Sequence, residues 1–229
     1  MDAAGKIDLL HYGKSGPWWF THTPAEGIQY LRALAAEIDI PAELRRLVCE
    51  TTLELPDDLA STLPQVDAVV VELSTFKTLE VDSYRLNFQN VHRYAREAGV
   101  PPRDVVWGVP VDWPDSHQLL IDMVVGKATS TQVHDELLEI RDRVGAPMLT
   151  VDHLYATTDS GDLVPGRDDL TAALNDLEAT AGVPFHSTRP IIERFGEQVA
   201  LQDSNHYRAD FEETAGDALL ESLQELLSR

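Results

Sequence analysis

The sequence predicts an α/β protein with an open, mostly parallel sheet that helices cover on both faces, a three-layer α/β/α sandwich. Short apolar runs alternate with amphipathic stretches along all 229 residues, which is the pattern of such folds. Residues 67–73 (DAVVVEL) carry consecutive apolar side chains, as expected of a parallel strand buried on both faces. No fixed-period repeat interrupts the alternation. This length fits a single domain, residues 1–229.

The first half of the chain justifies its elements one by one. Residues 7–12 (IDLLHY) are expected to form a strand, which the following glycines and proline end. Residues 23–26 (TPAE) have the spacing of a capping box with proline at the first helical position, so a helix is expected from there to about residue 38. Residues 46–54 are the next expected strand before the central one. A helix is then expected over residues 83–98, because its apolar side chains lie near helical spacing and Gly99 follows.

In the second half, the clearest element is a helix over residues 130–144, which ends in Arg141, Arg143 and Gly145. The apolar, glycine and proline patterns predict the remaining elements: strands at residues 105–109, 147–153 and 183–186, helices at residues 115–125, 168–181 and 208–228, and a turn at Pro190. Ligands of open parallel sheets bind beyond the carboxyl ends of the strands. A site is therefore expected in the segments that follow each strand.

Charge and cysteine content exclude several classes of partner. The chain has 39 acidic and 18 basic residues, a net charge of −21, which repels phosphate backbones and anionic lipid surfaces. Nucleic acid and membrane are therefore not expected partners. A single cysteine, Cys49, forms no internal disulfide and no multi-cysteine zinc site. No secretory signal or long apolar run is visible, so a soluble, cytoplasmic protein is expected.

Two short motifs at opposite ends of the chain carry chemistry. Gly13-Lys14-Ser15 follows the first expected strand, and a serine in a tight turn at a strand end exposes its hydroxyl as a nucleophile requires. The alternative is a serine that only stabilises the turn. Asp203-Ser204-Asn205-His206 precedes the last expected helix. An aspartate at this spacing can hold an imidazole in one tautomer while its other nitrogen takes a proton.

Together, Ser15, the VVVEL strand and the Asp203–His206 motif resemble the layout of the SGNH (GDSL-type) hydrolases, with residues 147–220 the most similar. The resemblance implies one flavodoxin-like α/β/α domain, with residues 74–146 as a family-specific insert or lid. It also implies a serine esterase, thioesterase or O-acyltransferase acting on a small-molecule or carbohydrate ester. Ser15 is then the nucleophile, His206 the base and Asp203 its orienting carboxylate. Neither a cofactor nor a metal is expected.

The chain departs from the family where the oxyanion is bound. Lys14 replaces the aspartate before the serine, and Ser74-Thr75-Phe76-Lys77 replaces the Gly-x-Asn-Asp motif. Because a lost oxyanion donor costs about 10²–10³ in rate, other residues are expected to supply one. The candidates for oxyanion or substrate binding are Lys14, Ser74, Lys77, Asn87, Asn90, His153 and Arg167, with Trp18 and Trp19 as an apolar or sugar-stacking wall. Ordinary hydrogen bonding or core packing explains each of them equally well.

Two other readings stay open. A non-catalytic member of the family would bind a carbohydrate or metabolite in the same crevice. A metal-dependent hydrolase would use His11, Asp152, His153 and His206, since imidazole and carboxylate suit zinc, iron or manganese. Adjacent strand residues point to opposite faces, however, so only one of Asp152 and His153 can face a shared centre.

Overall fold

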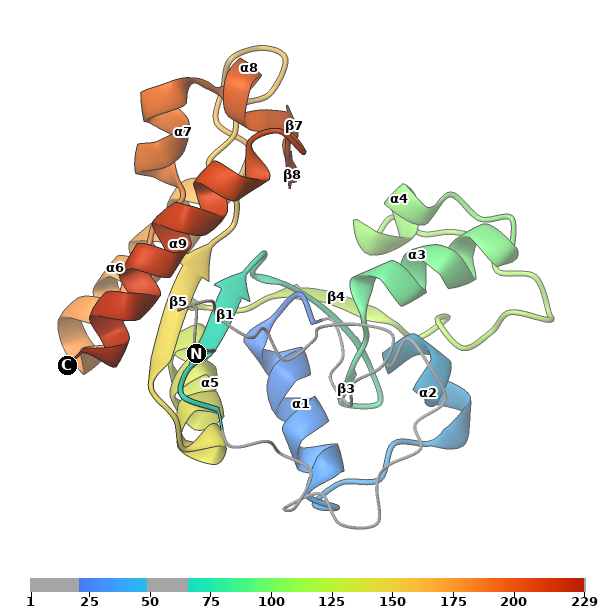
Figure 1. Ribbon diagram of the computed structural model, residues 1–229. Coiled ribbons are helices and arrows are strands. Elements are labelled where there is room, and N and C mark those ends of the chain that lie inside the picture. Colours follow the sequence, from blue (N-terminus) through green and yellow to red (C-terminus); the bar gives the residue numbers. More distant parts are fainter. Residues whose placement is uncertain (1–20, 49–65, 229) are drawn as a thin grey trace. The chain divides into compact units, whose positions relative to one another are not determined.

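The computed structural model describes residues 21–48 and 66–228 and shows a mixed α/β protein (Figure 1). The chain divides into two compact units, one of residues 1–22, 26–63 and 78–126, the other of residues 23–25, 64–77 and 127–229. The expected strand over residues 7–12 and residues 49–54 of the next one lie outside the described residues. A single domain with an insert at residues 74–146 stays a prediction.

The second unit is built around a small parallel sheet. Its strands are β1 (Val69–Leu73), β5 (Met148–Asp152) and β6 (Phe185–His186), in the order β1-β5-β6. Val69 pairs with Met148 and Leu73 with Asp152, so both long strands end at the same edge. Every residue of β5 is buried. The run of residues 67–73 was expected to be buried on both faces, and this is wrong: β1 alternates between half-buried and exposed residues before the buried Leu73, and Val70 is 39% exposed. The expected strands over residues 67–73, 147–153 and 183–186 are confirmed.

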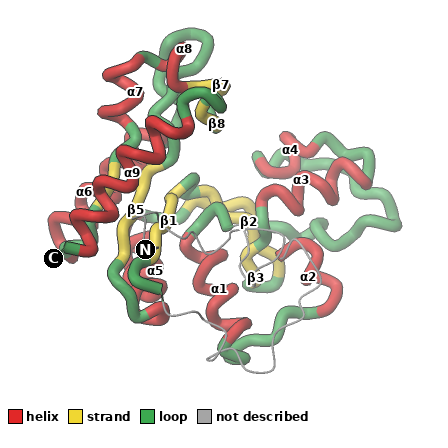
Figure 2. The backbone as a smooth tube through the Cα atoms, viewed as in Figure 1, coloured by secondary structure: helices red, strands yellow, loops and turns green. Residues whose placement is uncertain are grey.

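Helices and a hairpin complete the second unit (Figure 2). Helix α5 (Ser130–Val144) begins with a capping box between Thr129 and Gln132 and ends at Gly145 in the left-handed conformation, where glycine carries no steric cost. The other helices are α6 (Arg167–Ala181), α7 (Arg189–Phe195), α8 (Glu197–Ala200) and α9 (Glu212–Leu227). Strands β7 (Leu201–Asp203) and β8 (His206–Tyr207) form the hairpin, and α6 and α9 both contact β5.

The described residues of the first unit form helices and a second sheet. The helices are α1 (Pro24–Leu34), α2 (Ala42–Val48), α3 (Phe88–Glu97) and α4 (Pro102–Val106). The sheet has the order β3-β2-β4, with β2 (Lys77–Val81), β3 (Tyr84–Arg85) and β4 (Val124–Lys127). The hydrophobic core of this unit includes Leu47, Leu86, Val91, Ala95 and Val106. None of the helices in the described ranges combines the length and apolar character of a membrane span.

Two expected strands are wrong because helical signals lie just before them. Residues 46–48 belong to α2, where Leu44, Leu47 and Val48 are buried at helical spacing behind Pro41. Residues 105–106 belong to α4, which Pro102 opens at the first helical position. In both cases the apolar residues suit a strand when taken alone, but the preceding proline begins a helix that includes them.

Three further predictions need correction. The segment 115–125 forms turns and, from Val124, the start of β4 instead of a helix. The Gln118 amide donates to the backbone carbonyls of Trp113 and Pro114 and so competes with helical hydrogen bonds. The helix expected from residue 83 begins only at Phe88, since Asn87 caps it and a hairpin precedes it. Pro190 lies in the first turn of α7, where proline is tolerated.

Candidate active site

The candidate site is centred on the turn between β7 and β8. Asp203 and His206 face each other across this hairpin, and both carboxylate oxygens lie 2.9 Å from His206 Nδ1. The backbone N–H of Asn205 donates to Asp203 Oδ1 at 2.7 Å. A carboxylate only accepts, so Nδ1 carries the hydrogen and Nε2 of the neutral ring is the free base. The His206 side chain is 70% exposed, and no residue in the described ranges bonds to Nε2.

The same contacts keep Asp203 ionised. The hydrogen bond from His206, and after it the Asn205 N–H, lowers the pKa of the Asp203 carboxyl, because both favour the charged form. A carboxyl with a lowered pKa keeps its stabilising contacts above its ordinary pKa and loses them as the pH falls through the lowered value. The Asp203–His206 pair is therefore fully formed at neutral pH.

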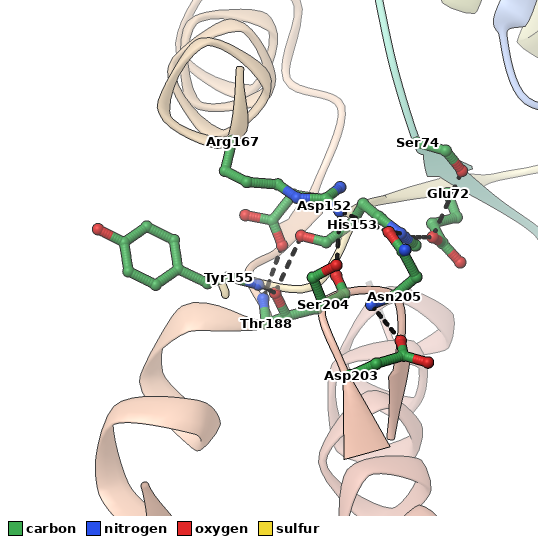
Figure 3. A network of polar contacts seen from close by, with 10 residues as sticks. All are labelled: Glu72, Ser74, Asp152, His153, Tyr155, Arg167, Thr188, Asp203, Ser204 and Asn205. Atoms are coloured by element: carbon green, nitrogen blue, oxygen red, sulfur yellow. Dashed lines mark hydrogen bonds and ion pairs between the residues drawn. The ribbon is translucent and has the colours of Figure 1, made fainter. Parts of the chain in front are cut away.

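A second imidazole–carboxylate pair lies at the end of the sheet (Figure 3). Glu72 of β1 contacts His153 Nδ1, and the Ser74 hydroxyl points at the same carboxylate oxygen at 3.5 Å. His153 Nε2 lies 3.3 Å from Oδ1 of Asn205. The side chain of His153 is only 17% exposed. Since both ring nitrogens have partners, His153 has no free nitrogen for a substrate or a metal.

Arg167 reaches this network from the first turn of α6. Its Nη2 donates to the Ser204 carbonyl at 3.1 Å and to Asn205 Oδ1 at 3.0 Å. The residue is only 6% exposed. Burial lowers the pKa of Arg167, while the charges of Glu72 and Asp152 act in the opposite direction; an arginine nevertheless stays charged in proteins. The guanidinium thus holds the turn from inside the protein.

Asp152 points away from His153, as strand alternation predicts. The carboxylate is 1% exposed and accepts from Thr171 Oγ1 at 2.6 Å, Ser187 Oγ at 3.1 Å and the Thr188 backbone N–H at 2.7 Å. It therefore ties the end of β5 to α6 and to the segment after β6. Within residues 21–48 and 66–228, no three His, Cys, Asp or Glu residues gather as a metal site requires. His11 lies outside that range.

Tyr207 is a further polar group beside the site. Burial, together with the negative charges of Asp152 and Glu72, raises the pKa of its phenol to about 12. The phenol therefore stays protonated at neutral pH and retains an O–H donor. Its ring packs against Phe211, which leads into α9.

The structure gathers some of the predicted site residues in the second unit: Ser74, His153, Arg167, Asp203 and His206. Lys77 opens β2, where burial lowers the pKa of its amine. Asn87 is engaged as the cap of α3 and also donates to Glu26 at 3.3 Å. Asn90 is 2% exposed, and neither atom of its amide has a hydrogen-bond partner. The remaining candidates, Lys14, Ser15, Trp18 and Trp19, lie outside the described residues.

Two residues of the network were not predicted, although each carries a signal. Glu72 is the one charged side chain in the otherwise apolar VVVEL strand, and a charge there needs a partner. Asn205 lies inside the Asp203–His206 motif, in which only the first and last residues were predicted to have a role. Pairing Glu72 with His153 requires knowing that β1 and β5 are neighbours.

Comparison with known proteins adds a family and one curated relative. The family described as "TviD N-terminal domain" matches residues 1–109 and 111–222. The chain is 21% identical over 231 aligned positions to "Vi polysaccharide biosynthesis protein TviD" of Salmonella typhi, covering 89% of this chain. It spans only 27% of the length of that relative. No solved structure is significantly similar.

Proposed function

The chain belongs to the TviD N-terminal domain family, and on that premise we propose that it transfers an acyl group to or from a carbohydrate by serine catalysis. The relative at 21% identity is named for polysaccharide biosynthesis, which supports a carbohydrate substrate. The resemblance to SGNH hydrolases supports the reaction. In this proposal the parallel sheet β1-β5-β6 is part of a three-layer α/β/α domain of that type.

One observation carries the proposal: His206 is poised as a general base. Asp203 holds its Nδ1 with both oxygens at 2.9 Å, while Nε2 is uncommitted and the side chain is exposed. Proton transfer needs an acceptor that is oriented on one side and open on the other. His153, by contrast, has both nitrogens engaged. This difference supports His206, not His153, as the base in the proposal.

The proposed reaction has two half-steps. Ser15 Oγ attacks the carbonyl carbon of the donor ester while His206 Nε2 takes its proton, and Asp203 stabilises the imidazolium. The donor's C–O or C–S bond breaks, and His206 returns the proton to the leaving alcohol or thiol. A sugar hydroxyl, or water, then attacks the acyl-serine, and His206 moves its proton back to Ser15.

The oxyanion would be stabilised by groups other than the family's usual motif. Asn87 already uses its side-chain oxygen to cap α3, so its amide is tied to that helix. Asn90 is buried, and within the described ranges its amide has no hydrogen-bond partner. In the proposal the oxyanion donors are the N–H of Ser15 with Asn87 or Asn90 and the charge of Lys14 or Lys77.

An acyl-transfer assay tests this function. Purified protein is incubated with an activated acetyl ester, with and without oligosaccharide acceptors, and both free acid and acylated sugar are quantified. Turnover is expected in the wild type and its loss in Ser15→Ala. Ser116→Ala is the matched control, because this exposed serine also contacts a histidine ring yet has no role in the proposal, and it should keep full activity.

Two results would contradict the proposal. Turnover that survives in Ser15→Ala removes the serine from the reaction. Glycan binding without any turnover in the wild type instead supports a non-catalytic carbohydrate-binding member of the family, a function that the altered oxyanion motif at residues 74–77 favours.

A further inference from the structure

Asn205 lies in the turn between β7 and β8, and its side chain contacts Arg167 and His153. Its backbone N–H donates to Asp203 Oδ1 at 2.7 Å, and its side-chain Oδ1 contacts both Arg167 and His153 (Figure 3). The residue therefore touches the carboxylate that orients His206, the buried Arg167 and the half-buried His153. Asn205 is itself exposed, as are Asp203 and His206 of the same motif.

Hydrogen-bond chemistry fixes the orientation of the Asn205 amide. Arginine only donates, so the atom that receives Nη2 of Arg167 at 3.0 Å is the oxygen. The same oxygen lies near His153 Nε2. His153 Nδ1 in turn contacts the carboxylate of Glu72. The chain of contacts runs from Glu72 on β1 through His153, just after β5, to the turn.

Arg167 is committed to this turn by its burial. Its Nη2 donates to Ser204 and Asn205, and within the described part of the chain its buried Nε has no hydrogen-bond partner. A buried guanidinium needs acceptors to offset its desolvation, and the turn supplies them. Besides this contact, the hairpin is held by its own short ladder and by Leu201 and Tyr207, which pack with Phe211 in an apolar cluster.

We propose that Asn205 is a positioning residue for the proposed acyl transfer, and that Glu72, His153 and Arg167 act through its side-chain oxygen to fix the Asp203–His206 pair. The inference rests on the proposed function, which supplies the reaction that the pair serves. Asn205 itself touches no substrate in this account. Its contribution is the angle at which the turn presents His206, and a small misplacement of a catalytic group costs up to about 10²-fold in rate.

Asn205→Ala is expected to lower kcat for ester turnover by roughly tenfold or more, with KM unchanged. Asn205→Asp keeps an acceptor for Arg167 and His153 and should restore kcat to within about threefold of the wild type. Asn175→Ala is the control, because this exposed amide bonds only the Thr171 carbonyl one helical turn away. Its kcat should equal that of the wild type.

A second readout does not need activity. Carboxyl NMR titration should show Asp203 with a lowered pKa in the wild type and in Asn175→Ala, and a pKa closer to the ordinary value in Asn205→Ala, because the loosened turn weakens the His206 contact. The inference is overturned if Asn205→Ala leaves both kcat and the Asp203 titration unchanged, or if Asn205→Asp fails to restore kcat. Failure of the proposed function looks different, since the wild type itself would then show no turnover that depends on His206.

Discussion

Replacing His206 with alanine is expected to lower kcat/KM for acyl transfer by about 10²–10⁴-fold, the usual contribution of a general base. Stability should hardly change, because the side chain is largely exposed and its bonds go to Asp203 alone. Initial rates with the activated ester and thermal melting curves measure the two quantities on the same preparations.

Asp203→Asn should also lower the rate while leaving the melting temperature nearly unchanged, because the amide no longer enforces the correct tautomer of His206.

The control for this pair is His117→Ala. His117 contacts Ser116 at 2.9 Å and packs on the ring of Tyr94, so it resembles His206 in having a local polar partner. Its replacement should leave kcat/KM at the wild-type value. A His206→Ala protein that retains more than about a tenth of the wild-type rate would contradict the assignment of the base. A large fall in the melting temperature of Asp203→Asn would instead identify Asp203 as a structural residue.

The second large effect is expected on stability. Asp152→Ala should lower the free energy of unfolding by roughly 2–4 kcal/mol, because it leaves the buried donors of Thr171, Ser187 and Thr188 without their acceptor. Asp152→Asn should cost less, since the amide keeps one oxygen and the two hydroxyls can accept from its N–H groups. Urea denaturation followed by circular dichroism gives both values.

Asp162→Ala is the matched control for this experiment. Asp162 is exposed, and its carboxylate accepts only from the nearby Ser160 hydroxyl, so the loss should stay under about 0.5 kcal/mol. An Asp152→Ala protein that is as stable as the Asp162→Ala protein would show that the buried carboxylate does not hold β5 to its neighbours.

The fold of the second unit could be read from the sequence to a large extent. Strands β1 and β5 are runs of apolar residues, and α5 has a capping box at one end and a glycine at the other. These signals are local and physically strong, so they survive in the structure. The strand expected at residues 105–109 is wrong because the five residues after Pro101 are enough to form a short helix. So short a helix shows no periodicity in the sequence.

Less of the candidate site could be predicted from the sequence. The Asp203–His206 contact follows from a spacing of three residues and is visible in the motif itself. The Glu72–His153 contact joins residues 81 positions apart, and only the register of β1 against β5 brings them together. Arg167 is predicted from the sequence as a candidate substrate ligand, and its burial and its bond to Asn205 could not be predicted there. Long-range pairing of this kind is set by topology, which the order of residues does not reveal.

The most direct test of serine catalysis is covalent labelling of Ser15. A fluorophosphonate probe reacts with serines that a neighbouring base activates, and peptide mapping by mass spectrometry locates the adduct. An adduct on Ser15 is expected in the wild type and in His117→Ala, and no adduct is expected in His206→Ala. A wild-type protein without label on Ser15, or a His206→Ala protein labelled as fast as the wild type, would contradict the proposal.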